Sequence, residues 1–262
     1  MDLKIKNKWA LVTGGANGIG EEISEELAKS GVNLVVTSRS ADPITKLKNK
    51  LKKYNVEVHG ILVDFLHDGW LVEFKNQIKN FSIDILVNNA GHNLNITDPY
   101  ASIEDWQKVL DLNFFSAVQI NNLLIPNMKS SGWGRIVNIT SCAGLENMGP
   151  ITYGVSKASL TAYTRTMGRI LATEGGAVVM SAIFPGVVVT KGGHWDKVLK
   201  TDPERAKKYL DERCPLGRFG KTSEIAPVVT FYCSEHVSFS HGAIIPVDAG
   251  QVRSYMYFNY MD

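Results

Sequence analysis

A tyrosine and a lysine lie four residues apart in the segment from Thr152 to Ala172, whose apolar spacing predicts a helix. On a helix, Tyr153 and Lys157 occupy one face, about one turn apart. Tyrosine can act as a base near neutral pH only if its phenolate is stabilised, because its ordinary pKa is about 10. A lysine ammonium and the positive end of the helix dipole each favour the phenolate. The pair is therefore a candidate for proton transfer, although this spacing also arises by chance on ordinary helices.

A serine and an asparagine extend this candidate site. Ser141 follows the predicted strand from Arg135 to Thr140, and its hydroxyl can donate to a substrate carbonyl oxygen at the sheet edge where α/β folds bind ligands. Asn113 lies among apolar residues of a predicted helix over 102–129, where asparagine is a poor helix former. It is either a structural amide or a functional one. Cys142 has no histidine in a supporting motif and is interpreted as a small buried residue.

A glycine-rich turn, TGGANGIG at residues 13–20, is the second candidate site. It follows an apolar run that begins at Trp9 and opens an amphipathic segment that ends near Ser30, which is the strand–turn–helix context of a dinucleotide-binding loop. Glycines in such a loop allow the tight turn, the approach of a pyrophosphate and close helix–strand packing. The helix start attracts the anion. A tight turn without a ligand is the alternative.

The end of the next predicted strand indicates which dinucleotide fits. An acidic residue at this position would bind the ribose 2′-hydroxyl of NAD. The sequence instead has Ser38 and Arg39, with no acid before Asp42. A guanidinium presents a fork of donors to phosphate oxygens, so this end suits a 2′-phosphate. NADP(H) is favoured and NAD(H) is the alternative. If Arg39 is only a solvated surface residue, it does not indicate which cofactor binds.

Short apolar runs alternate with amphipathic segments along the whole chain, which predicts right-handed βαβ units. We expect a single-domain α/β fold over residues 1–262, a Rossmann-type doubly wound parallel sheet of about seven strands flanked by helices. The predicted strands are 9–13, 32–37, 56–63, 83–87, 135–140, 177–184 and 243–247.

Composition excludes several classes of protein. The chain of 262 residues has 28 lysines and arginines against 26 aspartates and glutamates, without the basic excess of a general nucleic-acid binder. Its apolar runs are shorter than the roughly 20 residues of a transmembrane helix. The three cysteines form no CxxC motif and the six histidines no pair at helical spacing, so no metal site is expected. Without an apolar leader segment, a cytoplasmic location is expected.

The motifs together resemble those of the short-chain dehydrogenase/reductase family, in its TGxxxGIG/YxxxK branch. They are TGGANGIG, NNAG at 88–91, Asn113, Ser141, YGVSK at 153–157 and PGVVVT at 185–190, in this order, and the resemblance runs from Lys8 to about Gly250. It implies an oxidoreductase that transfers a hydride between a nicotinamide cofactor and a carbonyl or secondary alcohol.

The resemblance also implies roles for individual residues. Tyr153 would donate the proton in reduction and accept it in oxidation, and Lys157 would lower its pKa and hold the nicotinamide ribose. Ser141 would position the substrate oxygen, and Asn113 would hold a water of the proton relay. Besides Ser38, Arg39, Tyr153 and Lys157, the implied cofactor contacts are Gly14, Asn17, Gly18, Ile19, Gly20, Asp64, Asn89, Ala90, Gly91, Pro185, Gly186, Val188 and Thr190.

The substrate is the least determined part of the prediction. Besides Ser141, candidate contacts are His92 and Asn93 after the NNAG motif, Met148 before the tyrosine, and Trp195. Several are polar and could hydrogen-bond a small polar substrate such as a sugar or sugar derivative; the alternative is that they are solvated loop residues. A 3-oxoacyl-thioester reductase is the alternative. A non-catalytic nucleotide-binding regulatory protein is a weaker one, because Tyr153 and Lys157 are both present.

Three further expectations concern assembly and mobile parts. The segment 191–213 combines a lysine-rich face with apolar residues, between glycines and a proline, as expected of a lid over the substrate. The aromatic C-terminal tail, about 251–262, should cover a pocket or a neighbouring subunit. Apolar residues on the helices at 102–129 and 152–172, such as Leu123, Leu124, Leu160 and Tyr163, predict contact with a symmetric copy. The resemblance implies a homotetramer or homodimer built on these two helices.

Overall fold

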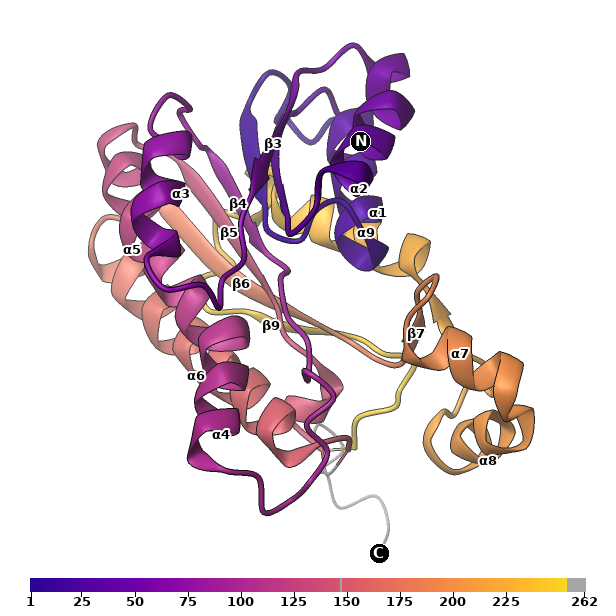
Figure 1. Cartoon of the computed structure of the whole chain (residues 1–262). Helices are drawn as coiled ribbons and strands as arrows, with labels where there is room; N and C mark the ends of the chain where they lie inside the picture. Colours follow the sequence, from indigo (N-terminus) through magenta and orange to yellow (C-terminus); the bar gives the residue numbers. More distant parts are fainter. Residues whose placement is uncertain (147, 254–262) are drawn as a thin grey trace, which may run out of the picture.

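A computed structural model describes residues 1–146 and 148–253, and its centre is a seven-stranded parallel sheet (Figure 1). The strand order is β3-β2-β1-β4-β5-β6-β9. Every predicted strand is present, so the predicted fold class is confirmed. Their bounds are β1 Trp9–Val12, β2 Asn33–Ser38, β3 Val58–Leu62, β4 Ile85–Asn88, β5 Gly134–Ile139, β6 Val178–Pro185 and β9 Ile244–Val247.

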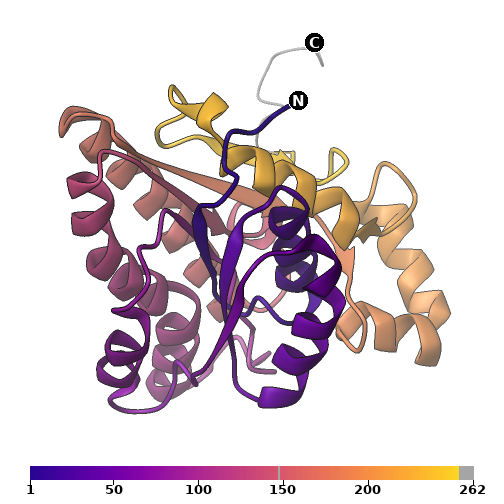
Figure 2. The ribbon, with the colours of Figure 1, turned by 90° about the horizontal axis from the view of Figure 1, so that it is seen from above.

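Helices cover both faces of the sheet (Figures 1 and 2). One apolar cluster joins the sheet to helices α1, α2 and α9, and the other joins it to α3, α5 and α6. Side chains alternate between the clusters along a strand: Leu34 and Val36 pack on one face and Val35 on the other. The helices are α1 Gly18–Lys29, α2 Ala41–Leu51, α3 Trp70–Ile78, α4 Ile103–Leu110, α5 Ser116–Ser130, α6 Ile151–Thr173 and α9 Thr222–Tyr232.

The strand order creates the crevice in which such folds bind ligands. The connection after β1 leads to α1 on one face, while the chain after β4 leads to helices on the other face. Because β1 and β4 are neighbours, their carboxyl ends open a gap between the two sets of connections. The TGGANGIG and NNAG segments follow these two strands and therefore meet at that gap.

The predicted helix over 102–129 is not one regular helix, which corrects that expectation. A π-helical turn over Asp111–Phe115 separates α4 from α5, and Asn113 lies within it. The Asn113 side-chain amide donates to the Val109 carbonyl oxygen at 2.9 Å, which is the carbonyl one regular turn earlier. A side chain that bonds this carbonyl competes with the helical backbone, and widened turns of this kind are frequent at functional sites.

The segment 191–213, expected to form a lid, contains two helices. It forms α7, His194–Thr201, and α8, Pro203–Arg213. Asp202 separates them: its carboxylate accepts from the Arg205 backbone N–H at 3.1 Å, and Pro203 occupies the first turn of α8. Proline cannot continue α7 but is well suited to start a helix. A small ribbon of β7, Val188–Val189, and β8, Gly220–Lys221, lies beside this pair (Figure 1).

Within the described parts of the chain, no helix combines the length and the apolar character needed to span a bilayer.

Candidate active site

The serine, tyrosine and lysine are brought together between β5 and α6. Ser141 follows the end of β5, and its hydroxyl shares a hydrogen bond with Tyr153 near the start of α6. One turn later, the Lys157 ammonium donates to the Ile139 carbonyl oxygen at 2.9 Å, which ties α6 to the end of β5. The expected clustering of these three side chains is thus present in the structure.

Three hydrogen bonds hold the Asn113 side chain in place. Its amide nitrogen donates to the carbonyl oxygens of Val109, at 2.9 Å, and His92, at 2.8 Å, and its oxygen accepts from the His92 backbone N–H at 3.1 Å. A Cβ on Gly91 would lie 2.5 Å from Asn113 Oδ1 and 2.9 Å from Lys157 Nζ. Gly91 therefore keeps open the space where the amide and the ammonium approach each other.

Burial controls the ionisation of both catalytic candidates. Lys157 is 2% exposed, and desolvation lowers its pKa from 10.5 to about 8. Desolvation also raises the pKa of Tyr153 to about 12, which outweighs the opposing effect of its hydrogen bond with Ser141. Burial thus shifts the pKa of Tyr153 in the direction opposite to the one expected from Lys157. The physical reason is that removal of the phenolate from water costs more than the neighbouring groups return.

The glycine loop is shaped by contacts that sequence reasoning missed. Thr13 Oγ1 accepts from the backbone N–H groups of Asn89, at 2.9 Å, and Ala90, at 3.0 Å, so the two loops are joined. Thr37 Oγ1 accepts from the Gly14 N–H at 2.9 Å and links the loop to the end of β2. The available signal was a hydroxyl residue at the carboxyl end of a strand, which is easily overlooked because threonine is common in strands.

The backbone conformation and packing of this loop require its glycines. Gly14 and Gly18 have φ values of +62° and +55°, which favour glycine. A Cβ on Gly20 would lie 2.3 Å from the Gly14 carbonyl oxygen, so close helix packing requires the glycine. A Cβ on Gly18 would lie 3.3 Å from Thr190 Cγ2, which places the loop beside the PGVVVT segment. The expected phosphate and nicotinamide segments therefore face each other.

Arg39 and Asp64 lie at the ends of neighbouring strands and line one cavity of about 200 Å³. Both side chains are exposed. Partial burial lowers the pKa of His92, and the positive charges of Arg39 and Lys197 lower it further. Arg39, directly after β2, and Lys197, on helix α7, thus both act on the side chain of His92.

The predicted substrate residues fall into two groups. His92 and Asn93 follow β4, and Asn93 Oδ1 accepts from the Asn95 backbone N–H at 3.0 Å in its own loop. Trp195 of α7 packs on Tyr209 of α8, with ring centroids 4.2 Å apart, and Tyr209 OH contacts Met148 Sδ at 3.8 Å. The structure joins Met148 to the lid in this way, and Tyr209 is a neighbour that the sequence did not reveal.

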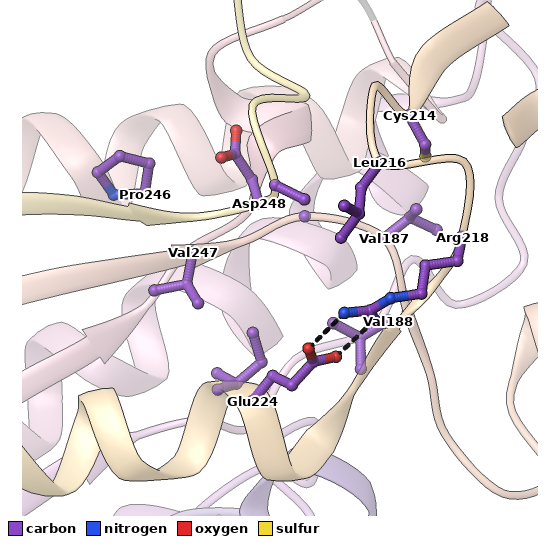
Figure 3. Close-up of a pocket in the computed structure, with 13 residues that line it drawn as sticks. Val187, Val188, Cys214, Leu216, Arg218, Glu224, Pro246, Val247 and Asp248 are labelled. Carbon is purple, nitrogen blue, oxygen red and sulfur yellow. Dashed lines mark hydrogen bonds and ion pairs between the residues drawn. The ribbon is translucent and has the colours of Figure 1, made fainter. Parts of the chain in front are cut away.

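A larger cavity, about 310 Å³, adjoins the PGVVVT segment (Figure 3). Its wall includes Gly186 and Val188. Arg218 and Glu224, which also line it, form a bidentate ion pair with N–O distances of 2.7 and 2.8 Å. The wall does not include Ser141, Tyr153 or Lys157. Size alone therefore does not identify the reaction site. Most of the expected aromatic tail lies outside the described residues.

Comparison with known proteins assigns the fold and site to a family. The model of the short chain dehydrogenase family matches residues 8–196. The 3-oxoacyl-[acyl-carrier-protein] reductase of Aquifex aeolicus is 35% identical over 254 residues, which is 95% of this chain and 99% of that protein. The chain belongs to the short-chain dehydrogenase family. It is an oxidoreductase.

Solved structures of related reductases superpose on nearly the whole of this chain. L-Sorbose reductase from Gluconobacter frateurii, complexed with NADPH and L-sorbose, has a TM-score of 0.89 and 28% identity, and covers 97% of this chain and 100% of its own. A 3-oxoacyl-(acyl-carrier-protein) reductase from Agrobacterium tumefaciens with NADP bound has a TM-score of 0.87 and 25% identity, with coverages of 95% and 96%.

The buried lysine predicts an unusual pH dependence of stability. Between pH 8 and 10.5 the unfolded chain still holds the proton that folded Lys157 has lost, so the free energy of unfolding rises with pH. Lys157→Met removes this contribution. We expect the stability of the variant relative to the nucleotide-free wild type to fall by about 2–3 kcal/mol between pH 7 and pH 10. Urea denaturation across this range measures it, and a constant difference would contradict the assigned lysine pKa.

Proposed function

We propose that this short-chain dehydrogenase transfers a hydride between NADP(H) and a carbonyl or secondary alcohol on a small polar substrate. The observation that carries the proposal is the convergence of Ser141, Tyr153 and the buried Lys157 beside a glycine loop at the crevice. The left-handed backbone at Gly14 and Gly18 and the close packing at Gly20 give the tight turn of a dinucleotide-binding loop.

Each residue of the site would have its own role in the reaction. The cofactor, when bound, supplies or accepts the hydride. Ser141 donates a hydrogen bond to the substrate oxygen, and Tyr153, protonated at neutral pH with its pKa of about 12, delivers the proton to that oxygen in reduction. Lys157 is held at the end of β5, where its ammonium counters the phenolate that this step leaves. In oxidation the tyrosine must first lose its proton, so a positive charge nearby matters most in that direction.

The proposed preference for NADP(H) rests on Arg39. Its exposed guanidinium shares a cavity with Asp64, at the edge where the adenosine end would lie. A charge-assisted bond between guanidinium and phosphate is strong and geometrically specific. The L-sorbose reductase with NADPH and the 3-oxoacyl reductase with NADP support the same preference.

For the substrate, a ketone-bearing sugar or sugar derivative is the first candidate. His92 and Asn93 supply polar groups at the crevice, and Trp195 supplies an aromatic face on the lid. The likeness to L-sorbose reductase supports this class. A 3-oxoacyl thioester is the second candidate, and the observation that favours it is the 35% identity to the Aquifex aeolicus enzyme.

The proposed chemistry predicts a specific loss of activity. Wild-type protein is assayed for NADPH oxidation with a panel of keto sugars and acetoacetyl thioesters, and the best substrate is used for the variants. Tyr153→Phe keeps the ring but removes the transferable proton, so we expect turnover to fall by about 10²–10⁴-fold. Tyr163→Phe, further along the same helix, is the matched control and should keep most of the activity. Near-normal turnover of Tyr153→Phe would contradict the mechanism.

The cofactor preference gives a second test. Arg39→Ala should weaken NADPH binding by about ten- to a hundredfold, because a charge-assisted contact is lost, and should leave NADH binding nearly unchanged. Lys48→Ala, which removes an exposed cation from the neighbouring helix α2, controls for general electrostatics. Fluorescence titration measures both affinities. Equal weakening of NADPH and NADH would show that Arg39 does not contact the 2′-phosphate.

Assembly into a homotetramer or homodimer is also part of this proposal. Leu124 and Leu160, two of the residues that suggested it, are buried within the protomer and cannot contribute. Apolar exposure nevertheless remains near this surface at Phe115, Ile151 and Val155, at 40%, 49% and 41%. Apolar exposure of this extent along adjacent helices favours a symmetric contact. Sedimentation equilibrium at micromolar concentration should show a dimer or tetramer, and a monomer would contradict this prediction.

A further inference from the structure

One buried glutamine contacts three separate segments near the proposed site. Gln251 follows β9, is 6% exposed and has no role in the proposed chemistry. Its oxygen accepts from the Val187 backbone N–H at 2.9 Å, and its nitrogen donates to Tyr209 OH at 2.9 Å. The same nitrogen lies 3.5 Å from Met148 Sδ. One side chain thus contacts the PGVVVT segment, lid helix α8 and the loop before Tyr153.

The orientation of this amide is fixed by its partners. A backbone N–H can only donate, so the oxygen of Gln251 must face Val187 and the nitrogen must face the Tyr209 hydroxyl. The fit is tight, since a Cβ on Gly186 would lie 2.9 Å from Gln251 Oε1. The glutamine therefore restrains the Gly186–Val187 peptide, which directly precedes Val188. Val188 is the residue whose backbone is expected to face the nicotinamide.

The side-chain nitrogen of Gln251 contacts helix α8 of the expected lid. Tyr209 stands on α8, and its ring packs on Trp195 of α7 at 4.2 Å and lies parallel to Phe219 at 6.3 Å. The hydroxyl is therefore the polar end of an aromatic group that holds α7 and α8 together. Because Gln251 binds this hydroxyl, it joins the aromatic group to the segment that lies beside the expected nicotinamide.

The chain around the glutamine is itself restrained. The Asp248 carboxylate accepts from the backbone N–H groups of Gly250, at 3.1 Å, and Val252, at 2.8 Å. The Arg253 backbone N–H donates to Glu146 Oε1 at 2.6 Å. Gln251 thus lies in a turn that is held by hydrogen bonds, so its amide has a defined position. An amide held in this way can restrain the groups that it contacts.

We propose that Gln251 is a positioning residue of this active site, which fixes the peptide at Val187 and couples lid helix α8 to it. This inference rests on the proposed function, because it assigns the restrained segment to the cofactor. Loss of the amide frees Val187 and Tyr209 together, so the lid and the cofactor segment lose their common restraint. The effect should fall on binding of cofactor and substrate more than on the proton transfer by Tyr153.

The test separates the hydrogen bond of Gln251 with Val187 from its hydrogen bond with Tyr209. Gln251→Leu removes both bonds, and Gln251→Met, which keeps an unbranched chain, is made beside it in case the leucine variant does not fold. Tyr209→Phe removes only the bond with Tyr209 and keeps the aromatic packing. Arg253→Ala, exposed on the same turn, is the matched control. The readouts are NADPH affinity by fluorescence, KM and kcat with the best panel substrate, and hydrogen exchange of residues 203–213 without cofactor.

We expect the Gln251 variants to bind NADPH about tenfold more weakly, since a half-buried N–H loses its acceptor, and to raise KM more than they lower kcat. Exchange in 203–213 should become faster in the Gln251 variants and in Tyr209→Phe, whereas NADPH affinity should fall only in the former. A lower melting temperature with unchanged affinity, KM and exchange would show a merely structural role and overturn the proposal.

The exchange measurement uses no cofactor and therefore stays informative if the proposed function fails. Wild-type protein that neither binds nor oxidises NADPH would contradict the proposed function, while the exchange data would still report whether Gln251 restrains α8. Unchanged exchange in 203–213 of the Gln251 variants would overturn the coupling even if wild-type protein is an active reductase.

Discussion

The burial of one lysine ammonium is the constraint on which the site depends. Lys157 is almost fully removed from water, and the partner that the structure shows for it is a neutral backbone carbonyl, that of Ile139. An ammonium in this position is costly, as its lowered pKa of about 8 shows. Such a cost is tolerated where function requires a positive charge at a defined point. The proposed proton transfer by the neighbouring Tyr153 is such a function.

The rest of the fold can be understood as the means of holding this charge in place. Parallel strands β4 and β5 bring the NNAG segment and Ser141 to one edge, and α6 begins there with the tyrosine and lysine on the facing side. The π-helical turn points the Asn113 amide at the same spot, where Gly91 leaves room. Hydrogen bonds of Thr13 and Thr37 join the glycine loop to the NNAG segment and to the end of β2.

Much of this could be predicted from the sequence because the relevant signals are local. Apolar runs such as Val178–Pro185 identify strands, and Tyr153 and Lys157 are placed on one helix face by their spacing alone. Other features depend on contacts between distant residues. Gln251 lies 64 positions from Val187 and 42 from Tyr209, and no pattern along the chain joins them. The direction of the Tyr153 pKa shift likewise follows from burial, which only the folded structure reveals.

The most direct test of this account is the pKa of Lys157 in the protein without nucleotide. Selective ¹⁵N labelling of lysine, with the resonance assigned by its loss in Lys157→Met, allows the ammonium to be titrated by NMR. The account predicts that Lys157 titrates near pH 8, well below the ordinary lysine value of about 10.4. Titration of Lys157 together with the exposed lysines would show that the ammonium is solvated, and would contradict the buried charge on which the proposed site depends.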